Sequence, residues 1–248
     1  LLAGTGSSAL AESARDEPAW VSLWGEMLSR HTRAVEAEVG TRVDYSALSQ
    51  DPSWPQTVAA LSRFDPAGLH TREEKLAFWI NAYNILAIDI VLQSYPVKSI
   101  RDIGWWFRPV FKRPAGEIYG RSYSLDEIEH EILRPMGEPR IHGALVCASV
   151  SCPNLLREPY RAEGLYNQFD ASLRAWMRRP EKGLWLDRER GVLRVSRVFD
   201  WFREDFGAGG GVLPFVTRYA PLRDAAWIRA NPGPVSLEYF PFDWNLND

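Results

Sequence analysis

The amino-acid sequence predicts an α+β fold, in which one helix-rich domain carries a small antiparallel sheet and surrounds a buried central helix at about residues 72–94. Several segments have apolar residues at helical spacing, which favours a helix-rich chain. The central segment is apolar around almost its whole circumference, which is typical of a buried helix. Two apolar runs, 184–187 and 192–196, flank a turn at 188–191, and this pattern indicates a β-hairpin.

The length and composition are those of one globular domain. The chain has 248 residues, of which 46% are hydrophobic and 25% are charged. We expect residues 18–248 to form this domain, and residues 1–17 to be a signal-peptide remnant or a disordered tail. The tripeptide at 9–11, Ala-Leu-Ala, has the small-x-small pattern at which signal peptides are cleaved. This predicts an exported protein, periplasmic or extracellular, whose two cysteines meet an oxidising compartment.

Charge and hydropathy exclude two classes of partner. The net charge is −3 and the basic residues are scattered, so the sequence has no electrostatic footprint for nucleic acid. After the N-terminus no segment reaches about 18 uninterrupted apolar residues, so we expect no transmembrane segment. Eleven tryptophans indicate an aromatic-lined groove or a thick aromatic core. We therefore expect a small-molecule or peptide ligand, and the oligomeric state stays open.

The first two long helices are predicted from apolar spacing. One spans Pro18 to Val39, and the central helix begins at Thr71, which forms a capping-box pattern with the glutamate three residues later. Asn81 and Asn84 are three residues apart and share one side of this central helix. Buried amides need hydrogen-bond partners. These two side chains therefore either tie down neighbouring backbone or orient a catalytic or ligand group.

A long loop and a third helix follow. Residues 103–119 contain the aromatic run at 105–107 and several prolines and glycines, which indicates either an aromatic lid or a loop held by its own aromatic side chains. A second capping-box pattern at Ser124 begins a helix that ends before Pro135.

On this third helix, Glu129 falls inside the apolar arc and His130 falls outside it. A carboxylate that faces a core needs a partner. The candidates for that partner are Arg140 and His142, in a structural ion pair or a functional one.

The stretch from 140 to 155 holds both cysteines. The apolar run 141–148 predicts a buried strand, on which His142 and Cys147 point to opposite faces. Cys152 follows the run and directly precedes a proline, which is favoured at the start of a helix. If a helical turn begins in 154–160, Cys152 lies at its positive end, where the pKa of a thiol falls and the thiolate becomes nucleophilic.

Three other interpretations of the cysteines remain open. Cys147 and Cys152 form a disulfide if the intervening loop brings their Cα atoms within about 7 Å. They are both inert buried thiols if each simply packs in the core. In the third interpretation the two cysteines and His142 bind zinc. Four residues separate each of these side chains from the next, however, so the sequence lacks the Cys-x2-Cys pair that zinc sites usually contain.

The C-terminal part is predicted to alternate helices with strands and to end on a polar, aromatic segment. The expected elements are a helix at 165–178, the hairpin, short helices at 198–206 and 213–219, and an alternating strand at 235–240. The closing residues 243–247 either fray or pack Trp244 into the body of the protein.

Five separated motifs, in this order, resemble the family called domain of unknown function 547. They are Phe78-Trp79-Ile80-Asn81-Ala82-Tyr83-Asn84, Tyr95-Pro96-Val97 with Ser99-Ile100-Arg101, Ile128-Glu129-His130 with Leu133-Arg134, the stretch from Arg140 through Cys147 to Pro153, and Asp243-Trp244-Asn245-Leu246-Asn247. The similarity spans roughly Trp20 to Asn247. The family carries no established reaction, so the resemblance implies only which positions to examine: Asn81, Asn84, Glu129, His130, Arg140, His142, Cys147 and Cys152.

Our leading functional hypothesis is an exported thiol-dependent hydrolase or acyl transferase. Cys152 acts as the nucleophile and His142 as its base, while Asn81 or Glu129 orients the imidazole, following the logic of catalytic triads. No cofactor and no metal are required.

The remaining candidate residues are assigned to ligand binding: Cys147, Asn84, His130 and Arg140. The main alternative is a non-enzymatic binding module with structural cysteines and an aromatic-lined groove for a peptide, a glycan or a small thiol. A mononuclear zinc site that uses His142 and a cysteine is a third interpretation of the same residues.

Overall fold

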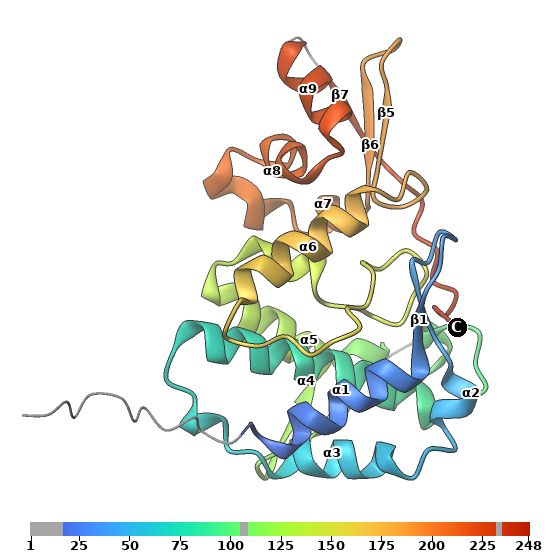
Figure 1. Cartoon of the computed structure of the whole chain (residues 1–248), viewed down its shortest axis with the longest axis vertical. Helices are drawn as coiled ribbons and strands as arrows, with labels where there is room; N and C mark the ends of the chain where they lie inside the picture. The colour runs from blue at the N-terminus through green and yellow to red at the C-terminus, as the bar shows by residue number, and fades with distance from the viewer. Residues whose placement is uncertain (1–16, 105–108, 232–234) are drawn as a thin grey trace, which may run out of the picture.

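Helices form about half of the structure, and short strands pair into small sheets (Figure 1). The structure is a computed structural model that describes residues 17–104, 109–231 and 235–248. The expected signal-peptide remnant and the aromatic run at 105–107 therefore lie outside the described residues, apart from Glu17. The predicted α+β class, one helix-rich domain with small sheets, is confirmed.

The helices are spread along the chain, and the segment 144–164, which holds both cysteines, contains none. The α-helices are α1 (Ala19–His31), α2 (Tyr45–Leu48), α3 (Ser53–Arg63), α4 (Arg72–Leu92), α5 (Leu125–Glu127), α6 (Leu165–Met177), α7 (Val198–Trp201), α8 (Val212–Tyr219) and α9 (Leu222–Ala230). Shorter helical turns are η1 (Pro66–Gly68), η2 (Ile100–Asp102), η3 (Val110–Lys112), η4 (Ile128–Leu133), η5 (Arg134–Met136), η6 (Pro139–Gly143) and η7 (Arg203–Gly209). Most of these turns are 3-10 helices, whereas η4 is a π-helix.

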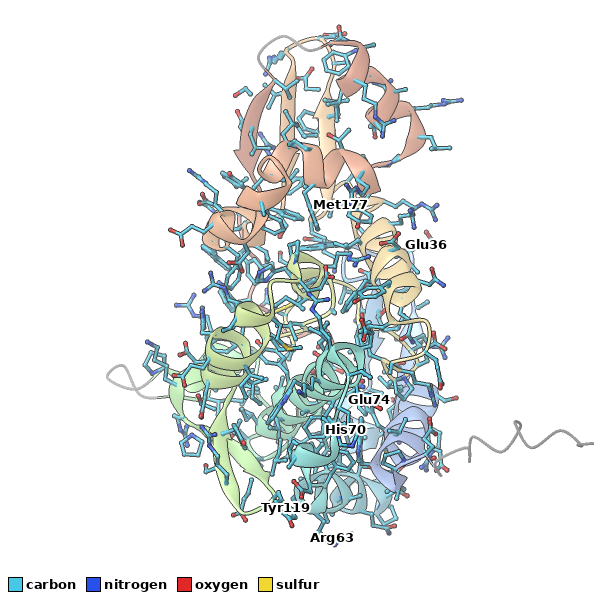
Figure 2. The ribbon with its side chains drawn as sticks, turned by 90° about the vertical axis from the view of Figure 1, so that its left-hand side faces the viewer. Glu36, Arg63, His70, Glu74, Tyr119 and Met177 are labelled. Atoms are coloured by element: carbon cyan, nitrogen blue, oxygen red, sulfur yellow. A yellow bond between two sulfur atoms is a disulfide. The ribbon has the colours of Figure 1, made fainter. Side chains whose placement is uncertain are left out.

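The strands pair into three small sheets. They are β1 (Thr32–Ala34), β2 (Thr41–Val43), β3 (Pro114–Ile118), β4 (Arg121–Ser124), β5 (Leu184–Asp187), β6 (Val192–Val195) and β7 (Ser236–Tyr239). The predicted β5–β6 hairpin is confirmed, and β7 adds to it in parallel on the β6 side. At the tip of the β3–β4 hairpin, the Tyr119 amide donates to the carbonyl of Ser62 at the end of α3 (Figure 2).

The central helix α4 is buried as its apolar sequence predicts. Its capping box is complete: the Thr71 hydroxyl accepts from the Glu74 amide, and the Glu74 carboxylate accepts from the Thr71 amide. Every residue at 76–88 is buried. By length and composition alone α4 also qualifies as a membrane-crossing helix, but 83% of its most apolar window is covered by the rest of the protein. The absence of a membrane span stays a prediction.

Two clusters of buried hydrophobic residues form the core. The first cluster surrounds α4 and includes Trp24 of α1 and Ile141 of η6. The second cluster lies between α6, α8 and the β5–β6 hairpin, and includes Phe199 and Val216. Helix α6 joins them, because its Phe169 belongs to the first cluster and its end at Met177 belongs to the second (Figures 1 and 2).

Two predictions about the stretch that holds the cysteines are wrong. Residues 141–148 do not form a strand: η6 ends at Gly143 and irregular backbone follows. The Asn84 side chain satisfies part of this backbone, so the apolar run is buried without a sheet. No helix begins in 154–160, and this segment runs without regular structure to Tyr160. His142 and Cys147 therefore do not lie on opposite faces of a strand, and Cys152 does not lie at the start of a helix.

The C-terminal segment packs into the body, as one of the two expectations for it proposed. Ser149 and Leu246 form an isolated antiparallel bridge, and so do Ser99 and Asn245. Trp244 packs among other aromatic rings rather than fraying. This segment covers the loop that holds the cysteines.

Candidate functional site

A cavity of about 210 Å³ is lined by residues of both hydrophobic clusters. We call it the central pocket, and its lining residues are Tyr83, Phe111, Asp126, Glu129, His130, His142, Leu145, Cys147, Cys152, Pro153, Val198, Trp201, Phe202, Phe242 and Trp244. Five of the residues singled out from the sequence line it: Glu129, His130, His142, Cys147 and Cys152. The other three, Asn81, Asn84 and Arg140, do not.

Asn84 holds the backbone that leads into the pocket. Its Nδ2 donates to the carbonyl of Ala144 at 3.0 Å, and its Oδ1 accepts from the amide of Val146 at 2.9 Å. The side chain is 2% exposed, so both bonds lie in the interior. Asn84 therefore takes the place of the backbone hydrogen bonds that a neighbouring strand would make, and it positions the chain just before Cys147.

Asn81 is not an orienting partner of the imidazole. Its Oδ1 accepts from the Trp24 indole and from the Tyr160 amide, and its Nδ2 donates to the carbonyls of Ala77 and Tyr160. These four bonds join α1, α4 and the segment before α6. The interpretation of Asn81 as a residue that ties down neighbouring backbone fits this geometry.

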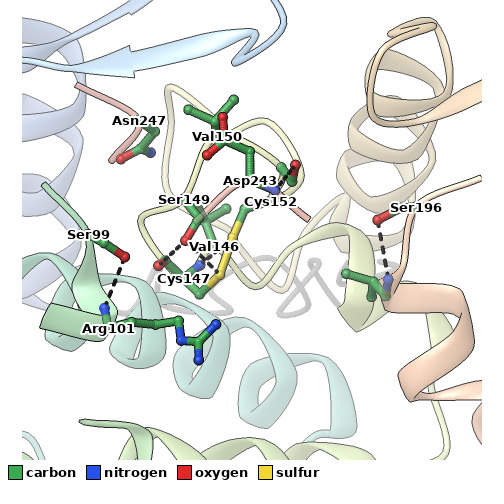
Figure 3. The surroundings of a disulfide bond; sticks show 12 residues. Ser99, Arg101, Val146, Cys147, Ser149, Val150, Cys152, Ser196, Asp243 and Asn247 are labelled. Carbon is green, nitrogen blue, oxygen red and sulfur yellow. Dashed lines mark hydrogen bonds between the residues drawn. A yellow bond between two sulfur atoms is a disulfide. The ribbon is translucent and has the colours of Figure 1, made fainter. Parts of the chain in front are cut away.

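The two cysteines form a disulfide, with their Cα atoms 6.3 Å apart. Their environments differ: Cys152 is 2% exposed, whereas Cys147 is only partly buried. The amide of Cys147 donates to Sγ of Cys152 at 3.1 Å, and Sγ of Cys147 lies 3.7 Å from the Ser149 hydroxyl (Figure 3). The backbone of the loop turns back at Ala148, whose φ of 60° lies in the left-handed region.

His142 is held by a carboxylate that the sequence did not indicate. Its Nε2 lies 2.7 Å from Oδ2 of Asp205, and Arg134 bonds both oxygens of that carboxylate at 2.7 Å. The imidazole also stacks on Phe202, with ring centroids 4.2 Å apart. The pairing with Asp205 assigns the proton to Nε2, so the lone pair of Nδ1 stays free to accept a proton.

The electrostatics of this pair favour a neutral imidazole beside an ionised carboxylate. Burial lowers the pKa of His142 below its usual value, although the charge and hydrogen bond of Asp205 oppose the shift. Burial also opposes ionisation of Asp205, but hydrogen bonds from Arg134 and His142 outweigh it and hold its pKa well below the usual range. The result is an oriented base that is uncharged at neutral pH.

Glu129 faces His142 from the π-helical turn η4. Its Oε1 lies 4.0 Å from Nδ1 of His142, too far for a hydrogen bond. Burial raises the pKa of Glu129 to about 7, against the nearby charge of Arg134 and a hydrogen bond from the Tyr83 hydroxyl. π-Helical turns recur at functional sites, and this one presents a carboxylic acid to a base. Of the two expected partners of Glu129, His142 is confirmed as a neighbour.

Arg140 takes part in a different cluster. It donates to both oxygens of Glu138 at 2.8 Å and to Asp170 at 3.2 Å. Arg140 therefore anchors η6 to α6 from outside the pocket.

His130, unlike Arg140, lines the pocket, and its Nδ1 lies 2.7 Å from a guanidinium nitrogen of Arg134.

Aromatic side chains form the outer wall of the central pocket. The ring centroids of Trp201 and Trp244, which stack, are 5.8 Å apart, and the ring centroid of Phe242 lies 4.9 Å from that of Trp201 and 4.5 Å from that of Trp244. The ring centroid of Phe111 lies 6.1 Å from that of Trp244. Trp201 is 48% exposed, so this wall reaches the surface. Of the two expectations for the aromatic residues, this wall fits the aromatic-lined groove, and it is built mainly from the C-terminal part of the chain. Other aromatic side chains, such as Trp24 and Trp176, lie in the core, as the second expectation proposed.

Lys182 supports the cysteine loop and was missed in the sequence. Its ammonium group donates to the carbonyls of Val39, Val150 and Cys152 at 2.8, 2.9 and 2.6 Å. The residue is 1% exposed. No local pattern in the sequence marks this lysine as buried, because its partners are backbone groups distant along the chain.

The donor groups of the pocket do not make a metal site. Over residues 17–104, 109–231 and 235–248, no three His, Cys, Asp or Glu side chains are grouped so that they could hold a metal ion. His142 is engaged by Asp205, and the two sulfurs are bonded to each other. The zinc interpretation of these three residues does not fit this geometry.

Comparison with known proteins supports the resemblance inferred from the motifs. Residues 66–177 match the model of a family described as a protein of unknown function, DUF547. The match is narrower than the span from Trp20 to Asn247, but it includes Glu129, His142 and both cysteines. No curated protein and no solved structure matches the chain.

Proposed function

We propose that the protein is a thiol-dependent hydrolase or acyl transferase whose active centre is the central pocket. The observation that supports this is the convergence of an acid, a base and a cysteine pair on one cavity. These groups come from η4, η6 and the loop after it, and the base is oriented by a carboxylate on η7. Such a nucleophile–base–orienter arrangement is the general signature of covalent catalysis.

Glu129 and His142 have complementary proton states at neutral pH. Burial raises the pKa of Glu129 to about 7, so a substantial fraction of the protein keeps the carboxylic proton at neutral pH, and Glu129 donates this proton to a leaving group. His142 is neutral and presents the lone pair of Nδ1, so it accepts the proton of an attacking thiol or water. Two titratable neighbours whose environments hold them in opposite roles are the expected form of an acid–base pair.

The nucleophile of this proposal is Cys147 rather than Cys152. Cys152 is favoured only if His142 and Cys147 lie on opposite faces of a strand and if a helix begins after Cys152, and neither condition holds. Cys147 is the more exposed of the two cysteines, whereas Cys152 is 2% exposed. The proposal requires reduction of the disulfide, because a sulfur in a disulfide has no thiolate to attack with.

The pocket fits a small substrate with an apolar body. Its volume of about 210 Å³ admits a short acyl group or one end of a larger molecule. The rings of Trp201, Phe242 and Trp244 provide flat apolar surfaces for that body. The acid, the base and the sulfurs are the polar groups that orient the reacting bond.

A reduction-dependent hydrolysis assay tests the proposal. The protein is assayed with chromogenic esters and thioesters, before and after treatment with a non-thiol phosphine reductant. We expect turnover only after reduction, a loss of about 100-fold in His142→Asn, and complete loss in Cys147→Ser. His70→Asn is the matched control, because His70 is exposed and outside the pocket. Equal activity of oxidised and reduced protein, or full activity of Cys147→Ser, would refute the thiol mechanism.

A binding module is the second candidate, and the disulfide itself favours it. Both cysteines are consumed in that bond, and the aromatic wall offers affinity without chemistry. This candidate predicts that oxidised protein binds a peptide, a glycan or a small thiol, and that no reduced form turns over an ester. Calorimetric titration of oxidised and reduced protein beside the hydrolysis assay separates the two candidates.

We infer that the protein works in an oxidising compartment, the periplasm or the extracellular space. The disulfide supports this, because such bonds persist outside the reducing cytosol. Fractionation of cells that express the natural full-length protein tests the inference. Recovery in the cytosolic fraction, with both cysteines reduced, would contradict it.

A further inference from the structure

We propose that the Cys147–Cys152 disulfide is a site of thiol–disulfide exchange, at which a small thiol enters the central pocket and attacks Sγ of Cys147. This activity goes beyond the hydrolase proposal and does not rest on it. Exchange needs only the disulfide and its surroundings, whether or not the reduced pocket hydrolyses a substrate.

The two cysteines are unequally exposed. Both cysteines line the pocket, but Cys152 is 2% exposed, while Cys147 is only partly buried. An incoming thiolate must approach one sulfur along the axis of the bond, so access decides which sulfur is attacked. The geometry points to Cys147 as the attacked sulfur and to Cys152 as the leaving group.

The leaving sulfur already lies in a site that stabilises negative charge. Sγ of Cys152 accepts a hydrogen bond from the Cys147 amide at 3.1 Å. Lys182 holds the backbone of the same residue through a bond to its carbonyl at 2.6 Å. The N–H that is donated to Sγ favours a thiolate, and a more stable thiolate leaves faster.

The frame around the disulfide does not depend on the disulfide. Asn84 holds the amide of Val146 on one side, and Lys182 holds the carbonyls of Val150 and Cys152 on the other. The C-terminal segment adds backbone bonds, including the one from the amide of Val150 to the carbonyl of Asn245. After reduction the two thiols therefore stay close together, and the bond can form again.

Atoms and electrons balance in this exchange. The thiolate of a small thiol forms a bond to Sγ of Cys147, the Cys147–Cys152 bond breaks, and the electron pair leaves on Cys152. A second small thiolate then attacks the sulfur of the first, which releases a small-molecule disulfide and the thiolate of Cys147. The two protons of the small thiols end on the two cysteines. The protein disulfide is reduced by two electrons, and the small thiol is oxidised.

Glutathione is the probe in the first experiment. The oxidised wild-type protein is mixed with a limiting amount of reduced glutathione, free thiols are blocked with N-ethylmaleimide, and peptide mass spectrometry locates both groups. We expect glutathione on Cys147 and N-ethylmaleimide on Cys152, with at least about tenfold preference over the reverse. Denaturation in urea before mixing should abolish this preference, because the fold creates it.

Two single variants provide the matched comparison. Cys152→Ser, treated with oxidised glutathione, should accumulate a stable mixed disulfide on Cys147, and Cys147→Ser should react about tenfold more slowly. Glutathione on Cys152, equal labelling in the native protein, or no adduct before unfolding would each overturn the proposal. The readout is the mass of the adduct, so a protein that exchanges thiols but cleaves no ester refutes only the hydrolase proposal.

Discussion

Replacement of Glu129 by glutamine should change how stability depends on pH. Burial raises the pKa of Glu129 from 4.5 to about 7 in the folded protein. Its side chain is 14% exposed, so solvent screens this effect only weakly. Each pKa unit corresponds to about 1.4 kcal/mol. The fold therefore favours the protonated form of Glu129 over the ionised form by about 3 kcal/mol more than the unfolded chain does.

The direction follows from proton linkage. Between about pH 4.5 and pH 7 the folded protein holds the Glu129 proton, while the unfolded chain has released it, so the free energy of unfolding falls as pH rises. The glutamine side chain of the variant has no such titratable proton. The stability of Glu129→Gln relative to wild type should therefore increase by about 3 kcal/mol between about pH 4 and pH 8.

Urea unfolding of the oxidised proteins, followed by tryptophan fluorescence across this pH range, measures the difference. His142 has the opposite effect: its lowered pKa removes stability as pH falls below about 6.5, but both proteins share it. Glu131→Gln is the matched control, because Glu131 is exposed on the same turn. Parallel stability curves for Glu129→Gln and wild type would refute the argument that burial holds the proton on Glu129.

Three further predictions concern the parts that position the pocket. Asp205→Asn should lower the free energy of unfolding at neutral pH by about 2 kcal/mol, because Arg134 loses its carboxylate. In urea titrations the deficit should shrink below about pH 4, because the unfolded wild-type chain then binds a proton at Asp205 while the folded protein, in which the pKa of Asp205 is strongly lowered, keeps it ionised. Asn84→Ala should cost about 2–3 kcal/mol in the same assay, since two buried backbone groups lose their partner, and should speed hydrogen exchange of the amide at 146. Reduction of Cys147 and Cys152 should lower stability by only about 2 kcal/mol, as measured by urea unfolding with and without reductant, because the closed loop is short.

The fold was predictable where the signal is local. The apolar circumference and the capping box of α4 define a buried helix without any knowledge of its neighbours. The prediction of a strand at 141–148 was wrong because the side chain of Asn84 bonds the backbone there in place of a neighbouring strand. Asn84 lies 60 and 62 residues away along the chain from its two partners, so an apolar run does not reveal this contact. Patterns of hydrophobicity report burial, and they do not report which group receives each hydrogen bond.

The site was predictable to a similar degree. The helical wheel identified Glu129 as a buried carboxylate in need of a partner, and His142 is its neighbour. Asp205 was missed, because it lies 63 residues after His142 in a segment with no motif. The preference for Cys152 rested on local geometry that the chain does not adopt, and only the arrangement in space shows that Cys147 is the more accessible cysteine.

The division of the pocket between two parts of the chain has a consequence for its chemistry. The segment that matches the family model, 66–177, supplies the acid, the base and both sulfurs. The carboxylate of Asp205 and the wall of Trp201, Phe242 and Trp244 come from outside it. The segment alone would therefore leave His142 without its orienting partner and the cavity without its outer wall. In the proposed mechanism, the reacting groups therefore belong to the matched segment, whereas orientation of the base and the choice of substrate depend on the C-terminal part.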